Sequence, residues 1–152
     1  MNYEIVNLEQ KTVAGIKIRT SNSSPSMEQE IGGAWQKFYA QGIYESIPGK
    51  VNGKAIGLYT NYENGPAGEY DVLVCCEVNS SESLPDGLET KVIPAGKYAK
   101  FTVQGNMEAV GACWGEIWQT KLDRKFDCDF EEYQECSDME HMEVYTYISL
   151  NS

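Results

Sequence analysis

The chain has 152 residues, 41% hydrophobic and 23% charged, which is typical of one soluble globular domain spanning residues 1–152. Its formal net charge of −11 disfavours direct nucleic-acid binding but suits cationic small molecules or a basic protein partner. The N-terminus lacks a signal-peptide pattern and no apolar run is long enough to cross a membrane, so we expect a cytoplasmic protein.

The first half of the chain predicts strand segments followed by a helix. Residues 4–8 and 12–19 are rich in β-branched side chains, and Gly15 indicates a bend or bulge. Ser26 ends a polar loop and is a favourable N-cap for a helix at residues 27–40. The helix carries one apolar stripe, formed by Met27, Ile31, Trp35 and Phe38.

A β-hairpin is expected after this helix. Residues 43–50 form a connection, and strand-like segments follow at residues 54–62 and 70–78. Gly57 interrupts the first of these segments. The turn signal at residues 64–68 lies between them and predicts antiparallel pairing.

The second half predicts the same kinds of element. A polar loop and a turn at residues 85–87 precede it, and Asn106 is the expected N-cap of its helix. The predicted elements are strands at residues 88–93 and 98–104, a helix to residue 120, and strands at 129–133 and 142–150.

An internal repeat relates the two halves, roughly residues 1–80 and 85–152. The segment at residues 31–39 matches that at 110–118 with a constant offset of 79 residues, which places Trp35 over Trp114. The flanking strands correspond as well, and their alignment puts Gly57 opposite Glu131. The alternative is a chance similarity between two amphipathic helices, but the shared order of four elements favours a duplication.

The repeat predicts the fold class. We expect an α+β protein built from two tandem β-α-β-β units with pseudo-twofold symmetry, an antiparallel sheet and two main helices. A ligand cleft is expected between the halves, because clefts at such junctions are preferred binding sites. Glycine in one half and Glu131 in the other would give this cleft a single anionic residue at its floor.

Alternation along the last two strands suggests where aromatic walls lie. Glu131 and Tyr133 share one face of their strand, and Tyr145 and Tyr147 share the non-aliphatic face of the next. If the two strands pair as a hairpin, these four side chains gather into an acidic, aromatic patch. The alternative interpretation is a solvated sheet face, on which Glu and Tyr are common.

Cysteine usage and the single histidine indicate no metal chemistry. Five cysteines with no Cys-x-x-Cys pair predict reduced, mostly buried thiols. Only His141 could join them as a ligand, and the spacing fits no zinc pattern, so we expect no metal site and no cofactor. We interpret His141 and the Cys75-Cys76 pair as structural.

Several short motifs follow one another along the chain and are shared with a known family. They are Gly57-Leu58-Tyr59-x-x-Tyr62, Leu84-Pro85-x-Gly87, Pro94-Ala95-Gly96-x-Tyr98-Ala99-x-Phe101, Phe130-Glu131-x-Tyr133 and Val144-x-x-Tyr147-Ile148, together with the tryptophan-bearing second helix. In this order they resemble the gyrase-inhibitor-like small-molecule-binding family, which includes the effector-binding domains of AraC-type and MerR-type multidrug regulators. The resemblance spans nearly the whole chain and implies the duplicated β-α-β-β fold.

The resemblance also implies a function. Glu131 matches a family glutamate that pairs with cationic, lipophilic ligands in an aromatic pocket. We therefore expect a stand-alone effector-binding protein, without a DNA-binding segment, that senses or sequesters amphipathic, cationic aromatic compounds. The candidate ligand-binding residues are Glu131, Tyr133, Tyr145, Tyr147, Tyr59, Trp114 and Trp118, whereas Trp35 is interpreted as a core residue.

Two other functions stay open at this point. Some relatives hydrolyse cyclopropanoid genotoxins, and here Glu131 would be the general base, since the sequence offers no other catalytic set. Gyrase-inhibiting relatives act through protein contacts. An acidic surface would suit such a role here, with gyrase or a regulator as the partner. We expect a binding protein rather than an enzyme, and a turnover measurement separates the two.

Overall fold

A computed structural model describes residues 3–21, 25–63, 68–79, 87–134 and 142–151. Within these residues, eight strands form one antiparallel sheet and three helices lie on its outer face. In chain order the elements are β1 (Glu4–Leu8), β2 (Lys11–Ser21), α1 (Met27–Ala40), α2 (Ile43–Ser46), β3 (Lys50–Thr60), β4 (Glu69–Val78), β5 (Glu89–Ile93), β6 (Gly96–Gly105), α3 (Met107–Gln119), β7 (Asp129–Tyr133) and β8 (Met142–Ser149).

The strand order is symmetric about its centre. It runs β1-β6-β8-β7-β3-β4-β2-β5, so the central pair is β3 and β7, flanked by β4 on one side and β8 on the other. Each half contributes the same succession, β2-α1-β3-β4 in the first and β6-α3-β7-β8 in the second. The predicted fold class, a tandem β-α-β-β duplication with pseudo-twofold symmetry, is confirmed.

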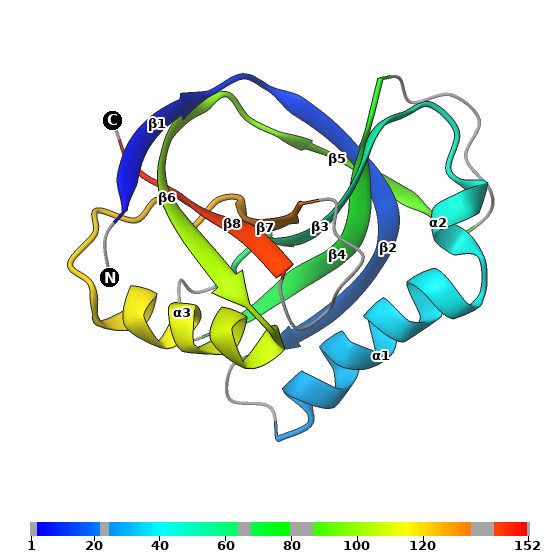
Figure 1. Cartoon of the computed structure of the whole chain (residues 1–152), viewed down its shortest axis with the longest axis horizontal. Coiled ribbons are helices and arrows are strands. Elements are labelled where there is room, and N and C mark those ends of the chain that lie inside the picture. Colours follow the sequence, from blue (N-terminus) through cyan, green and yellow to red (C-terminus); the bar gives the residue numbers. More distant parts are fainter. Residues whose placement is uncertain (1–2, 22–24, 64–67, 80–86, 135–141, 152) are drawn as a thin grey trace.

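The two halves exchange their first strands. β1 precedes β2 in the chain but pairs with β6 of the second half, and β5 precedes β6 but pairs with β2 of the first. Figure 1 shows these strands as the curved outer part of the sheet, with β1 beside β6 and β5 beside β2. Each half therefore completes the edge of the other.

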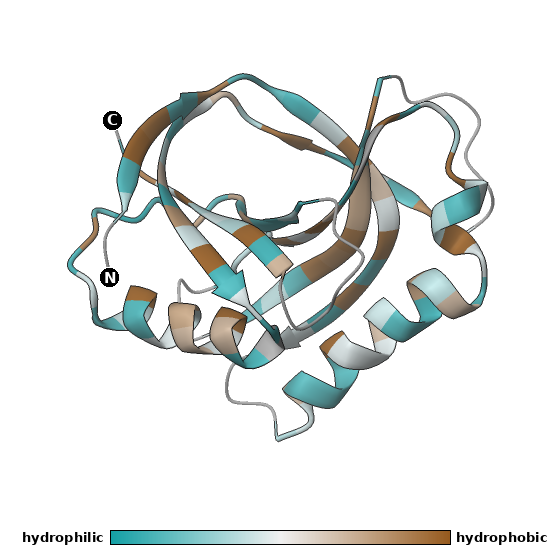
Figure 2. Ribbon diagram, viewed as in Figure 1, coloured by the Kyte–Doolittle hydropathy of each residue, from teal (hydrophilic) through white to brown (hydrophobic). Residues whose placement is uncertain are grey.

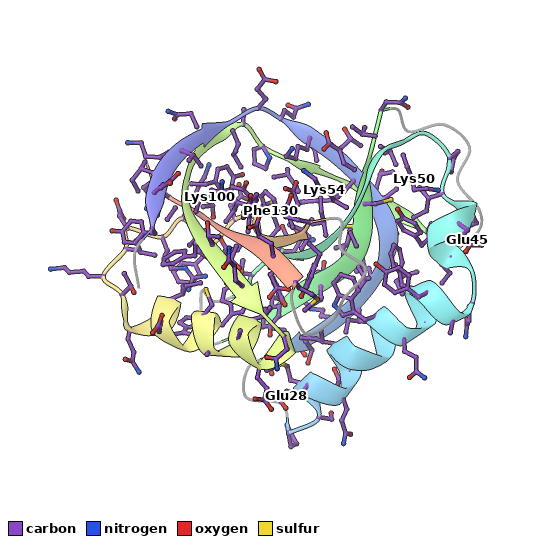
Figure 3. All side chains as sticks on the ribbon, in the orientation of Figure 1. Glu28, Glu45, Lys50, Lys54, Lys100 and Phe130 are labelled. Atoms are coloured by element: carbon purple, nitrogen blue, oxygen red, sulfur yellow. The ribbon has the colours of Figure 1, made fainter. Side chains whose placement is uncertain are left out.

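The sheet has an apolar layer on each face. Its concave interior is filled by side chains from strands of both halves, including Val13, Leu58, Phe130 and Tyr147, and Figure 3 labels Phe130 within this curve. On the outer face, α1 and α2 cover one cluster and α3 covers another. Figure 2 shows β4 as a largely hydrophobic ribbon between these layers, which agrees with burial of both its faces. The helices thus stay on one face, each over its own half.

Two glycines predicted to break strands lie within continuous ones. β2 pairs with β4 without interruption across Gly15, so the predicted bend or bulge is absent there. A Cβ on Gly15 would lie 2.0 Å from the Val74 carbonyl oxygen, so the glycine permits a close approach of two strands. β3 likewise runs unbroken through Gly57.

The predicted helix boundaries agree closely with the structure. Asn106 caps α3 by accepting a hydrogen bond at Oδ1 from the Ala109 amide at 3.2 Å, as expected. Ser26 precedes α1 as expected, although its hydroxyl donates to the Glu30 carboxylate at 2.7 Å instead of capping a backbone amide. The short helix α2 lies within the segment predicted as a plain connection. Most of the turn at 64–68, the start of the turn at 85–87, and His141 lie outside the described residues.

Candidate functional site

A cavity of about 620 Å³ lies between α1 and α3 on the outer face of the sheet. The central strands β3 and β7 form its floor, because alternate residues of each strand point away from the concave interior. This volume is typical of pockets that hold drug-sized ligands. The aromatic residues that line it are Trp35, Tyr59, Tyr62, Tyr70, Trp114, Trp118 and Tyr133.

The aromatic walls repeat across the pseudo-twofold axis. Trp35 of α1 packs edge-on against Tyr133 of β7, with ring centroids 5.1 Å apart and an interplanar angle of 71°. Trp114 of α3 packs against Tyr59 of β3 in the same way, at 5.2 Å and 71°. Each tryptophan thus contacts the tyrosine of the other half. The cavity lies on the axis and draws equally on both repeats.

One pair of equivalent positions breaks this symmetry. Gly57 and Glu131 are directly paired between β3 and β7, at the centre of the sheet. A Cβ on Gly57 would lie 3.1 Å from Glu131 Oε1 and 3.2 Å from Cζ2 of Trp35. These separations are tighter than ordinary van der Waals contact, so glycine makes room for both the carboxylate and the indole. The floor therefore holds one charged side chain.

The Glu131 carboxylate is buried among neutral hydrogen-bond donors. Glu131 is only 3% exposed. Its carboxylate accepts hydrogen bonds from Trp114 Nε1, from the Tyr133 hydroxyl at 2.9 Å and from the Tyr59 hydroxyl at 3.4 Å. Burial raises the pKa of Glu131, although all three donors act to lower it. Among the described residues no cation forms an ion pair with it. The carboxylate is therefore hydrogen-bonded by neutral donors, and no described side chain supplies a counter-charge.

A second buried carboxylate nearby is fully compensated. Asp129, two residues before Glu131 on β7, is 0% exposed and pairs with Arg124 at 2.7 Å. It also accepts hydrogen bonds from the Tyr62 hydroxyl at 2.7 Å, the Ser149 amide at 2.8 Å and the Ser149 hydroxyl at 2.9 Å. Arg124 lines the cavity, but its charge is already engaged by Asp129. Of the two buried carboxylates described here, Glu131 is the one without a cationic partner among the described residues.

Five of the seven predicted binding residues meet at this cavity. Glu131 lies at the floor with Tyr59 and Tyr133 beside it, and Trp114 contacts it from α3. Trp118, one turn further along α3, is 43% exposed and lies at the opening.

The other two predicted residues face the opposite side of the sheet. In the β7–β8 pair, Glu131 lies across from Thr146, and Tyr147 lies across from Phe130. Directly paired residues share a face, so Tyr147 stacks on Phe130 inside the concave core, with centroids 4.8 Å apart, and Tyr145 shares that face. The prediction that Tyr145 and Tyr147 line the pocket is wrong. The alternation within each strand was assigned correctly, but the register between them differs by one residue.

The cavity also includes residues that the sequence did not single out as ligand-binding. Trp35 lines it, although it was interpreted as a core residue. The repeat contained the signal for this position, because Trp35 is the equivalent of Trp114. The cavity is also lined by Tyr62, Tyr70 and Arg124. Their part in it follows from the three-dimensional structure and not from a sequence pattern.

No cluster suited to metal binding appears in the described part of the chain. Cys75, Cys76, Cys113 and Cys128 are buried free thiols. Burial raises the pKa of Cys76 and of Cys113 to about 11, so these two thiols are protonated at neutral pH. None of the described helices has the length and apolar character needed to cross a membrane.

Known proteins match this chain over nearly its whole length. The chain is 31% identical over 153 residues to YobU of Bacillus subtilis (strain 168), whose name proposes a role as a transcriptional regulator, and the match covers 96% of each protein. The crystal structure of the integron cassette protein VCH_CASS2, from the mobile metagenome of Vibrio cholerae, superposes with a TM-score of 0.80 at 28% identity, over 98% of this chain and 95% of that one.

A further solved structure shares the fold. SAV2435, whose structure is of a complex with tetraphenylphosphonium, superposes with a TM-score of 0.74 at 23% identity, over 98% of this chain and 94% of that chain. A model of the family described as "Cass2: Integron-associated effector binding protein" matches residues 4–150. The chain therefore belongs to the Cass2 family of integron-associated effector binding proteins.

Proposed function

We propose that this protein binds lipophilic organic cations, with the Glu131 carboxylate as the counter-charge, for sensing or sequestration. The observation that carries the proposal is a buried carboxylate at the floor of an aromatic cavity, surrounded by neutral donors and without a cationic partner among the described residues. A ligand that brings its own positive charge fits this arrangement.

The energetics favour a cationic ligand over a neutral or anionic one. Burying a carboxylate costs desolvation free energy, which an incoming cation offsets. Aromatic faces also attract cations, with about 0.5–2 kcal/mol per contact. Trp35, Trp114, Tyr59 and Tyr133 surround Glu131 with such rings, and the two tryptophans approach it from opposite halves.

Charges at the cavity opening act in the same direction. Glu28 of α1 and Glu108 of α3 line it, are exposed, and add negative potential there. Figure 3 shows Glu28 at the foot of α1. The net charge of −11 extends this field over the whole molecule. Cations are thereby attracted toward the opening before they contact Glu131.

Tetraphenylphosphonium is a suitable first probe, because SAV2435 shares this fold and its structure contains that cation. All three tryptophans of the chain line the cavity, so intrinsic fluorescence reports on it directly. We expect tetraphenylphosphonium to quench this fluorescence in the wild type. Tetraphenylborate, with a similar shape and the opposite charge, should not.

The matched variant is Glu131→Gln, which keeps the shape and removes the charge. It should weaken tetraphenylphosphonium binding by at least roughly tenfold, equivalent to about 1.4 kcal/mol. Equal affinity in wild type and variant, or equal binding of both probes, would refute the proposal. Neither probe has a strained ring to open, so the hydrolase alternative needs a cyclopropanoid compound. Its consumption by the wild type, followed by chromatography, would instead indicate a hydrolase that uses Glu131 as base.

A further inference from the structure

Four exposed glycines lie within the two long helices. Gly32 and Gly33 lie in α1, and Gly111 and Gly115 lie in α3. Glycine disfavours a helix because it gives up more backbone freedom on folding than any other residue. Apart from its chain neighbours and the backbone of its own helix, a methyl group added at any of the four positions would meet no protein atom within 4 Å. Packing of the fold therefore does not explain why these positions lack a side chain.

Two of the four glycines border the cavity and two do not. Gly32 and Gly111 are among the lining residues, whereas Gly33 and Gly115 are not. Gly32 and Gly111 are also equivalent positions of the repeat, with the same offset of 79 residues as Trp35 and Trp114. Each lies three residues before its tryptophan, one helical turn along the wall.

We infer that Gly32 and Gly111 set the width of the cavity and select for bulky ligands. A side chain at either position would extend into open space beside the aromatic walls, from α1 in one case and from α3 in the other. The helices are less stable without these side chains, and the space gained admits rigid cations whose aromatic rings spread in three dimensions. This inference rests on the proposed function and narrows its ligand class.

The test uses one double variant and a matched control in the same helices. Gly32→Leu/Gly111→Leu fills the cavity side, and Gly33→Leu/Gly115→Leu adds equal volume outside it. Each is titrated with tetraphenylphosphonium, which has four rings, and with benzyltrimethylammonium, which has one. Thermal unfolding of the unliganded proteins accompanies the titrations, and both variants should have a raised Tm because leucine favours helix.

The expected result is selective. The cavity variant should lose at least roughly tenfold in affinity for tetraphenylphosphonium, a steric cost typical of overpacking, and less than about twofold for benzyltrimethylammonium. The control should change neither affinity by more than about twofold. A raised Tm with lost binding shows that the loss is not caused by unfolding.

Two outcomes would overturn the inference in distinguishable ways. If the cavity variant binds tetraphenylphosphonium like the wild type, or the control loses as much, the glycines do not select ligand size. The proposed function then stands, provided that Glu131→Gln still weakens the cation. If the wild type binds neither cation, the proposed function fails and the inference fails with it.

Discussion

Gly57 and Glu131 occupy equivalent positions in the two repeats and lie directly opposite each other at the centre of the sheet. The glycine leaves the space that the carboxylate and the Trp35 ring fill. One half of the chain thus contributes space to the site, and the other contributes the charged group. The consequences of this single buried charge can be measured in several ways.

Cation affinity should depend on pH through Glu131. Burial raises its pKa above the ordinary value of 4.5, and a bound cation favours the charged form. Tetraphenylphosphonium affinity should therefore fall as pH drops through the raised pKa, by up to about tenfold per pH unit. Tyr59 and Tyr133, which contact Glu131, have pKa values raised by burial and stay protonated throughout. Fluorescence titrations between about pH 8 and pH 4 check this. If the affinity of Glu131→Gln for tetraphenylphosphonium depended on pH in a similar way, another titrating group would be responsible.

Glu131→Gln should stabilise the unliganded protein at neutral pH. Because the folded-state pKa is raised, charging Glu131 disfavours the fold, and stability falls as pH rises from about 4.5 through that pKa. We expect the variant to melt about 2–4 °C higher at pH 7, near 1 kcal/mol for a chain of this size, with a smaller difference in acid. Calorimetry measures this. A lower Tm for the variant at pH 7 would contradict the prediction.

Removing the hydroxyl groups of Tyr145 and Tyr147 should leave ligand binding unchanged. Both face the concave side, across the sheet from Glu131. Tyr145→Phe and Tyr147→Phe should each change tetraphenylphosphonium affinity by less than about twofold, as expected for residues outside the site. Trp114→Phe is the comparison, because it removes both a wall of the cavity and a donor to Glu131. If either tyrosine variant weakened binding as much as Trp114→Phe, the prediction that Tyr145 and Tyr147 line the pocket would be supported after all.

Asp129→Ala should destabilise the fold strongly. It would leave the Arg124 guanidinium buried without its counter-charge and remove the acceptor for Tyr62 and Ser149. The loss of a partner from a buried ion pair costs about 3–5 kcal/mol. Urea unfolding measures the difference. Asp127→Ala is the control, because its 3.8 Å pair with Lys125 is exposed and should contribute at most about 1 kcal/mol.

Gly15→Ala should also destabilise the protein. The added methyl group would lie 2.0 Å from the Val74 carbonyl oxygen and 2.6 Å from Cys75 Cα, both backbone atoms of β4. The strands must separate to admit it, at a cost of about 3 kcal/mol or more. Gly33→Ala, where the methyl group meets no atom within 4 Å, should be neutral or stabilising in the same urea experiment. Wild-type stability in Gly15→Ala would show that the strands adjust freely.

The sequence predicted the duplication because the repeat preserves the order of elements and the spacing of Trp35 and Trp114. It also placed Glu131 opposite Gly57, which the β3–β7 register confirms. It could not fix the β7–β8 register, since a shift of one residue exchanges the two faces and alternation within a strand does not determine it. Tyr145 and Tyr147 were assigned to the wrong face for this reason.

The role of Trp35 was missed for a different reason. It belongs to the apolar stripe of α1, and such a stripe is the same whether the helix covers a packed core or the wall of a cavity. The equivalence of Trp35 and Trp114 in the repeat is the sequence signal that separates the two cases, and the position of α3 on the other side of the axis explains it. Tyr62 and Tyr70 line the cavity and contact each other. Such contacts between separate segments cannot be predicted from the residue pattern within one segment.

The exchange of β1 and β5 means that neither half has a complete sheet by itself. Two identical half-length chains could close the same sheet as a homodimer, but each would then supply the same residue to the centre. Two glycines there would give no charge, and two glutamates would place like charges side by side, which forces one of them to hold a proton. A covalent duplication removes that constraint. One continuous chain is what permits a lone carboxylate on a twofold axis.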